Sequence, residues 1–273
     1  MTAPVPGHLA RILVGHSGPV NGVAFSPDAR LLATAGHDRT ARLWDPATGK
    51  QQRTLIVHSG PGRPVWGLAF SPDGRLLATA GHDGTARLWD PATGEQWRTL
   101  SEDGAVYGVA FSPDGRLLAT AGRYGRARLW DPATGKQQRT LSQAGAVIDV
   151  AFSPGGRLLA TVGDDSDGDG GGGVGGGGVG VGVGGTVRLW DPATGKQQRT
   201  LSQDRAVWGV AFSPDGRLLA TASQDGTARL WDPATGEQQR TLSQDCTVWG
   251  VAFSPDGHLL ATADDGGTVR LWD

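Results

Sequence analysis

The tripeptide Leu-Trp-Asp occurs six times and divides almost the whole chain into repeats. Its tryptophans are Trp44, Trp89, Trp130, Trp190, Trp231 and Trp272. Their spacings are 45, 41, 60, 41 and 41 residues, and a period in the low forties is typical of a four-stranded propeller blade rather than of a helical repeat. We therefore predict one all-β domain over residues 1–273, a six-bladed β-propeller. Its repeats span approximately 12–45, 54–90, 99–131, 140–191, 200–232 and 241–273.

Each unit contains four segments with the composition of β-strands. They read VWGVAF, RLLATAG, TARLWD and KQQRTL, and SPDG, QDGT and PATG separate them. Proline and glycine in these separators suit tight turns. The first two strands are apolar at nearly every position, which predicts a sheet covered on both faces, whereas the Gln-rich last strand suits an outer edge that faces water. We expect four-stranded antiparallel blades between two neighbours, with the strands running outward from the axis.

The two ends of the chain each hold part of one further unit. PVPGHLARIL, residues 4–13, aligns with PATGKQQRTL of the repeats, while the chain ends at Trp272 and Asp273 before such a segment. We expect the N-terminal strand to complete the last blade and close the ring without an unpaired edge.

These motifs resemble the WD-repeat family of β-propellers. The resemblance rests on the Leu-Trp-Asp endings, on Gly15 and His16, and on AFSPDGRLLATAG, and it covers essentially all of the chain outside a glycine-rich insert. It implies a rigid, usually non-catalytic platform that binds proteins or peptides around its central channel.

The resemblance also implies a hydrogen-bonded tetrad of His, Thr, Asp and Trp within a blade. In the first two units the tetrads map onto His16, Thr34, Asp38 and Trp44, and onto His58, Thr79, Asp83 and Trp89. We assign both histidines a structural role, because a buried indole N–H and a buried hydroxyl need partners. Elsewhere Asp103, Asp204 and Asp245 stand near the His position, so we expect the other four blades to be less tightly joined.

One position varies strongly within the repeated frame, four residues before the Phe that ends the first strand. It holds Asn21, Trp66, Tyr107, Ile148, Trp208 and Trp249. The family resemblance places it near the mouth of the channel, where exposed aromatic rings would suit a protein interface. We expect these residues, with Arg63 on one side, to bind the partner; the alternative is that the rings pack between blades as core.

An arginine two residues before every Leu-Trp-Asp tryptophan is a second constant feature. These are Arg42, Arg87, Arg128, Arg188, Arg229 and Arg270. A cationic ring for phosphate is one interpretation, but we favour an ion pair between blades or a stack on an aromatic ring.

A glycine-rich segment at residues 164–185 accounts for the 60-residue spacing. We expect a disordered loop, because glycine loses the most conformational entropy on ordering and buries no side chain. Asp164, Asp165, Asp167 and Asp169 resemble the start of a calcium loop, but the bidentate Glu that completes such a loop does not follow.

The composition of the chain limits which partners and cofactors we expect. The 25 basic and 27 acidic residues give a net charge of -2, which disfavours nucleic acid and anionic membranes as partners. The sequence has no apolar run of membrane-spanning length, no secretion signal and only one cysteine, Cys246. We expect a cytoplasmic monomer without a metal or cofactor.

Catalytic motifs such as GxSxG or GxxxxGK[ST] do not occur in the sequence. We therefore predict a non-catalytic scaffold that binds a protein or peptide. Two alternatives stay open: a regulatory or sensor module detached from a longer signalling protein, and an enzyme with its active site in the channel, near which Asp149 is the only acidic residue.

Overall fold

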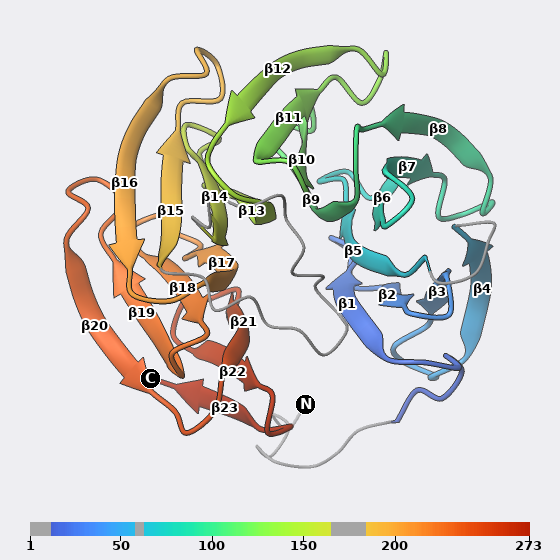
Figure 1. Cartoon of the computed structure of the whole chain (residues 1–273). Coiled ribbons are helices and arrows are strands. Elements are labelled where there is room, and N and C mark those ends of the chain that lie inside the picture. Colours follow the sequence, from blue (N-terminus) through green and yellow to red (C-terminus); the bar gives the residue numbers. More distant parts are fainter. Residues whose placement is uncertain (1–11, 58–62, 165–183) are drawn as a thin grey trace.

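The computed structural model describes residues 12–57, 63–164 and 184–273. These residues form six antiparallel sheets around a central axis (Figure 1), five with four strands and the last with three. Every element in the described ranges is a β-strand. The prediction of an all-β, six-bladed propeller is therefore confirmed.

The strands follow one another outward from the axis in each blade. The innermost strands are β1 (Val20–Phe25), β5 (Val65–Phe70), β9 (Val106–Phe111), β13 (Val147–Phe152), β17 (Val207–Phe212) and β21 (Val248–Phe253). The second strands are β2 (Leu32–Gly36), β6 (Leu77–Gly81), β10 (Leu118–Gly122), β14 (Leu159–Asp164), β18 (Leu219–Ser223) and β22 (Leu260–Asp264). The third strands are β3 (Thr40–Trp44), β7 (Thr85–Trp89), β11 (Arg126–Trp130), β15 (Gly185–Trp190), β19 (Thr227–Trp231) and β23 (Val269–Trp272). The outer strands are β4 (Gln51–Ile56), β8 (Gln96–Ser101), β12 (Gln137–Ser142), β16 (Gln197–Gln203) and β20 (Gln238–Ser243).

The hydrophobic core lies between consecutive blades. At the first junction Ala33, Ala35 and Leu43 of the first blade pack against Val65 and Leu77 of the second, and all five are fully buried. The next three junctions repeat this arrangement with corresponding residues. Small alanines on one face and larger side chains on the other let neighbouring sheets pack closely.

The turn after the inner strand is held by its own serine and aspartate in five blades, and in the fourth blade Gly155 stands in place of the aspartate. In the second blade Ser71 Oγ donates to Asp73 Oδ1 (2.6 Å) and accepts from the backbone N–H of Leu76 (2.9 Å). Gly74 follows with φ of +71°, a left-handed conformation that glycine adopts without strain. This turn reverses the chain tightly in each blade, with the sequence Ser-Pro-Asp-Gly in four blades, Ser-Pro-Asp-Ala in the first and Ser-Pro-Gly-Gly in the fourth.

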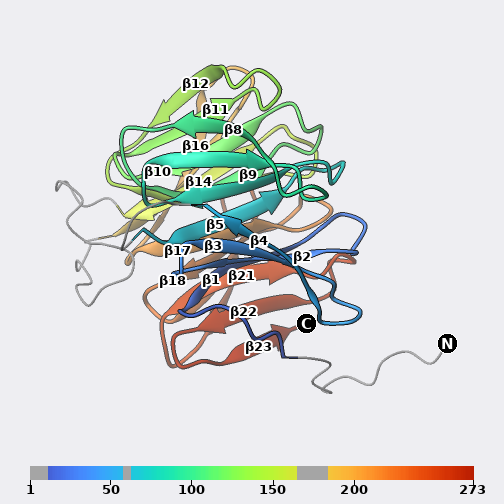
Figure 2. The same cartoon turned by 90° about the vertical axis from the view of Figure 1, so that its right-hand side faces the viewer.

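The six sheets, seen from the side in Figure 2, are stacked around the axis. Because the strands are antiparallel, the turns between second and third strands lie at the same side of the ring as the starts of the inner strands. We call this the upper side. It carries the residues that vary between the repeats.

The expected closure strand falls on residues 4–13, of which 4–11 lie outside the described residues. Within the described ranges the last blade has three strands, and Val23 of β1 and Leu271 of β23 are exposed. The described part of the ring is therefore open between its first and last blades (Figure 1).

Residues 165–183 of the glycine-rich segment lie outside the described residues. Most of the expected loop, and most of the aspartates that resemble the start of a calcium loop, fall in this range. Asp164 and Gly185, the two ends of the expected loop, are paired across β14 and β15. The strands therefore extend to both ends of the segment.

Candidate interaction site

Each inner strand contains a β-bulge at the variable position. In β5 the pairing with β6 passes from Val65 directly to Gly67, so Trp66 is the extra residue, and the other five inner strands have the same shift. A bulge leaves its extra residue unpaired and redirects its side chain. The propeller therefore presents six residues that its sheet pairing does not constrain.

Two aromatic groups form at these bulges. The first surrounds Trp66, whose ring centroid lies 5.3 Å from that of His37, 6.3 Å from that of His82 and 6.2 Å from that of Tyr107. His37 and His82 come from turns between second and third strands, so this group joins the first three blades. Neither histidine is predictable from the sequence, because no strand pattern places a turn residue beside a neighbouring blade.

The second aromatic group is the pair Trp208 and Trp249, with ring centroids 4.8 Å apart and planes inclined by 38°. Trp249 is 43% exposed, whereas Trp66 and Trp208 are partly buried. The indole N–H groups of Trp66 and Trp208 are buried and have no acceptor among the described residues. The surface that these two rings offer is therefore apolar, without the hydrogen-bonding tips that tryptophan brings to many interfaces.

The remaining variable residues separate the two aromatic groups. Ile148 is partly buried on β13, and the Asn21 side-chain amide donates to the backbone carbonyl of Val65 (2.9 Å) in the next blade. Arg63 is exposed just before β5. The aromatic residues expected around the channel mouth thus form two separate groups. Asn21 instead links the first blade to the second.

Asp149 occupies a position on β13 where the other five inner strands carry glycine. Its carboxylate accepts from the backbone N–H of Val150 (2.9 Å) and, in the next blade, of Val210 (3.2 Å). Burial raises its pKa to about 6, against the opposing effect of these two bonds. Asp149 is therefore a buried titratable group that links the inner strands β13 and β17 of two blades.

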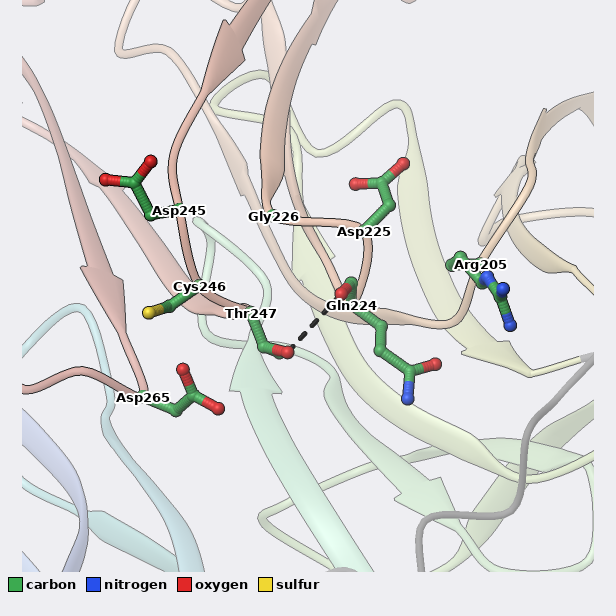
Figure 3. Close-up of a pocket in the computed structure, with 8 residues that line it drawn as sticks. All are labelled: Arg205, Gln224, Asp225, Gly226, Asp245, Cys246, Thr247 and Asp265. Carbon is green, nitrogen blue, oxygen red and sulfur yellow. Dashed lines mark hydrogen bonds between the residues drawn. The ribbon is translucent and has the colours of Figure 1, made fainter.

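A polar pocket of about 590 Å³ opens on the upper side between the last two blades (Figure 3). Its lining residues are Arg205, Gln224, Asp225, Gly226, Asp245, Cys246, Thr247 and Asp265. Thr247 Oγ1 donates to the Gln224 carbonyl (3.3 Å). Burial and the neighbouring carboxylates, Asp265 first, raise the pKa of the Cys246 thiol, so the thiol is protonated at neutral pH and is a poor nucleophile.

The tetrad residues of the first blade are joined within that blade. Trp44 Nε1–H donates to Thr34 Oγ1 (2.9 Å), which lies 2.7 Å from His16 Nε2, and His16 Nδ1 lies 2.9 Å from Asp38. Burial opposes ionisation of Asp38, but bonds from Thr40, His16 and Ser17 hold its pKa well below the usual range. His16 is fully occupied by these contacts.

In the second blade Trp89 donates to Thr79 (3.0 Å), and Arg87 pairs with Asp83 (2.9 Å). His58 lies outside the described residues.

The other four blades keep the hydrogen-bonded chain with different residues, which corrects the sequence expectation. Each Leu-Trp-Asp tryptophan donates to a buried threonine, and that threonine bonds to a Glu or Gln eighteen residues earlier in the chain. These partners are Glu102, Gln143, Gln203 and Gln244, not Asp103, Asp204 or Asp245. These residues stand at the position that corresponds to His16. Glu and Gln have one more side-chain carbon than Asp, and they reach the threonine. The strands of these four blades are therefore joined by the same kind of hydrogen-bonded chain.

The repeated arginines pair within their own blades, not between blades as expected. Arg229 reaches Asp225 (2.6 Å), and Arg128 pairs with Glu102. Contacts between blades come instead from the outer strands: Arg98 donates to the carbonyls of Ala133 (2.8 Å) and Thr134 (3.0 Å) in the next blade. The arginines near tryptophan are therefore structural.

The described residues contain no group of three His, Cys, Asp or Glu side chains placed to hold a metal ion. No helix of membrane-crossing length and apolarity occurs among them either.

Comparison with known proteins finds the family model for the WD domain, G-beta repeat, matching six segments. They are residues 7–45, 49–90, 94–131, 135–168, 195–232 and 236–273.

Individual relatives match over short segments. An uncharacterized WD repeat-containing protein of Synechocystis is 45% identical over 20% of this chain and 16% of its own length. The small ribosomal subunit protein RACK1 of Medicago sativa is 47% identical over 19% of this chain and 17% of its own. The transcription initiation factor TFIID subunit 5 of Caenorhabditis elegans is 49% identical over 17% and 7%. The match spans less than a fifth of each relative.

Proposed function

Because the chain belongs to the WD-repeat family, whose propellers generally mediate protein interactions, we propose that it is a non-catalytic scaffold. It binds a protein or peptide on the upper side of the ring, around the channel. The contact residues are those of the two aromatic groups, with Arg63 beside the first.

The observation that carries this proposal is the position of the aromatic residues on bulges. The sheet pairs the residues on both sides of each bulge, so the frame does not require a large ring there. Aromatic side chains at a partly exposed position lose little conformational entropy on binding and carry much of the energy of protein interfaces.

The channel offers less support for catalysis. Asp149 is titratable, but its two carboxylate oxygens accept backbone N–H groups. General acid–base catalysis needs a group positioned within reach of a reacting proton, usually beside a second functional group. Among the described residues, Asp149 belongs to no group of three His, Cys, Asp or Glu side chains that could hold a metal ion. Binding therefore accounts for the upper side better than catalysis does.

The test compares proteins captured from native lysate by the wild type and by the triple variant Trp66→Ala, Trp208→Ala, Trp249→Ala. Trp97→Ala is the matched control, because Trp97 is 50% exposed on the outer strand β8, away from the channel. We expect the wild type and the control to capture the same protein and the triple variant to lose it.

Circular dichroism and thermal melting establish that all three proteins are folded. A folded triple variant that captures the same protein as the wild type would contradict the proposal, and a triple variant that unfolds would show that the rings belong to the core.

A further inference from the structure

The residue that follows the second strand has the same place in five blades. Its backbone N–H donates to the carbonyl of the residue just before the inner strand, over 2.9–3.1 Å. The five residues are His37, His82, Arg123, Gln224 and Asp265. Because only the backbone makes this bond, the fold does not require any one of these side chains. Their differences therefore give each blade its own surface on the upper side.

These turn residues surround the aromatic groups. The ring of Trp66 lies beside two of them, a histidine of the preceding blade at 5.3 Å and a histidine of its own blade at 6.3 Å, measured between ring centroids. The positions that correspond to these histidines around Trp249 hold Gln224, of the preceding blade, and Asp265, of its own. Both also line the polar pocket. The two aromatic groups thus have different polar surroundings.

Positive charge prevails in the turns around the first aromatic group. The carboxylates of these turns in the first three blades form ion pairs with arginines of their own blades. The other charged residues of the described turns are Arg39, Arg63 and Arg123, and all three are positive. Together with the two imidazoles they make this half of the upper side complementary to acidic groups.

Arg39 adopts a backbone conformation that favours glycine. Its φ is +69°, and the corresponding Gly84, Gly125 and Gly226 have φ between +68° and +82°. A residue with a Cβ is strained in this region. Strained residues of this kind occur mostly at binding and active sites, and the Arg39 side chain is exposed. The strain therefore indicates that the charge of Arg39 serves binding rather than folding.

Negative charge prevails in the turns of the last two blades, around the second aromatic group. Two carboxylates there pair with arginines of their own blades. The other charged residues are one arginine and three aspartates, namely Arg205, Asp204, Asp245 and Asp265. Asp245 lies 3.7 Å from Arg270, an arginine that also pairs with Asp264. This half of the upper side is complementary to basic groups.

The second aromatic group and the pocket beside its turns suit a lysine or an arginine in particular. The rings of Trp208 and Trp249 offer faces on which a cation can stack. Gln224 lines the pocket, and its buried Oε1 has no donor among the described residues. A lysine or arginine side chain brings both a positive charge and N–H donors.

We propose that the upper side binds an extended peptide segment that is acidic at one end and basic at the other. The acidic end lies over the turns of the first three blades and the basic end over those of the last two, on opposite sides of the axis (Figure 1). This inference rests on the proposed function and adds the charge pattern of the partner. A nucleic acid or an anionic membrane carries one sign of charge, so one half of this surface would repel it.

The first test selects binders from a displayed library of random peptides of about twelve residues, which span about 40 Å when extended. The wild type and the triple variant Trp66→Ala, Trp208→Ala, Trp249→Ala are used in parallel. We expect peptides that bind only the wild type to carry Asp or Glu in one half and Lys or Arg in the other.

The outcomes separate the two proposals. Peptides that need the three tryptophans but show no separation of charge would support binding on the upper side and overturn the charge pattern. Failure to enrich any peptide, or peptides that the triple variant binds equally well, would contradict the proposed function and with it this inference.

The second test measures the affinity of one selected peptide, made synthetically, for single variants. We expect Arg39→Gly and Asp265→Asn each to weaken binding at least threefold. Arg39→Gly should melt no lower than the wild type, because glycine adopts this φ without strain. Arg75→Gln and Glu237→Gln are the controls, since both residues are exposed in turns on the opposite side of the ring, and they should bind as the wild type does.

A version of the peptide with its acidic residues replaced by glutamine assigns the two ends. Against this version Arg39→Gly should no longer weaken binding, whereas Asp265→Asn should still weaken it at least threefold. The proposal is overturned if neither variant weakens binding of the original peptide. It is also overturned if the loss in Arg39→Gly persists without the acidic residues, because Arg39 would then not contact them.

Discussion

Asp149 shows how a single side chain can depart from a repeated frame. It stands where the other inner strands have glycine, and its carboxylate accepts a hydrogen bond from Val210 of the next blade. Burial raises its pKa to about 6, above the ordinary value of about 3.9 in an unfolded chain. The native state therefore favours the protonated form of Asp149 relative to the unfolded state.

The sign of the resulting pH dependence follows from this difference. The contribution of protonated Asp149 to stability is fully present below about pH 4 and is lost as the pH rises through about 6. We predict that Asp149→Asn, which stays neutral, gains roughly 2–3 kcal/mol relative to the wild type between pH 4 and pH 7.5. Urea unfolding of both proteins at the two pH values measures the change; an equal difference at both would contradict it.

The hydrogen-bonded chains behind the tryptophans illustrate what the sequence could not reveal at this scale. The threonine and tryptophan of each chain were predictable, because they recur at fixed positions. The third member also stands at a fixed position, eighteen residues before the threonine, but its residue type changes from His16 to Glu102 and Gln203, which hid its role. Side-chain length decides which residue reaches the threonine. The pattern of polar and apolar residues does not indicate this reach.

At the scale of the elements, the strands were predictable and their bulges were not. Apolar runs bounded by Ser-Pro-Asp-Gly and Pro-Ala-Thr-Gly place four strands in each unit, close to the observed bounds. The bulge at Trp66 and its counterparts follows from the register between two strands, which a single strand's sequence does not contain. Comparison of the repeats reveals the variable position. That its aromatic residues form two separate groups depends on contacts between blades, which the sequence does not contain.

Contacts between inner strands lead to a prediction about glycine. Gly67→Ala should destabilise the protein by about 1–3 kcal/mol, because its Cβ would come within 2.9 Å of a backbone oxygen. Gly250→Ala should change stability by no more than about 0.5 kcal/mol, because the space there is open. Thermal unfolding of the two variants measures the two losses of stability. An equal loss of stability in both would contradict the prediction and would indicate a sixth junction, between the last and first blades.

At the scale of the whole molecule, the number of blades is predictable from the number of repeats. The opening between the first and last blades is not predictable from them. Six Leu-Trp-Asp endings predict six blades, and six sheets are observed. Whether six blades complete a circle depends on the rotation from each sheet to the next, which side-chain packing at the junctions sets. Within the described residues the first and last blades lie apart, and Val23 and Leu271 at their facing sides are exposed.

In our proposal the upper side of the ring binds a protein through its aromatic groups. The most direct measurement replaces Trp249 by a photo-crosslinking amino acid and, in a second protein, Trp97 on the outer strand. After irradiation in native lysate, we predict one cross-linked protein from position 249 and none of the same mass from position 97. Cross-linking of the captured protein from position 97 alone would contradict the account.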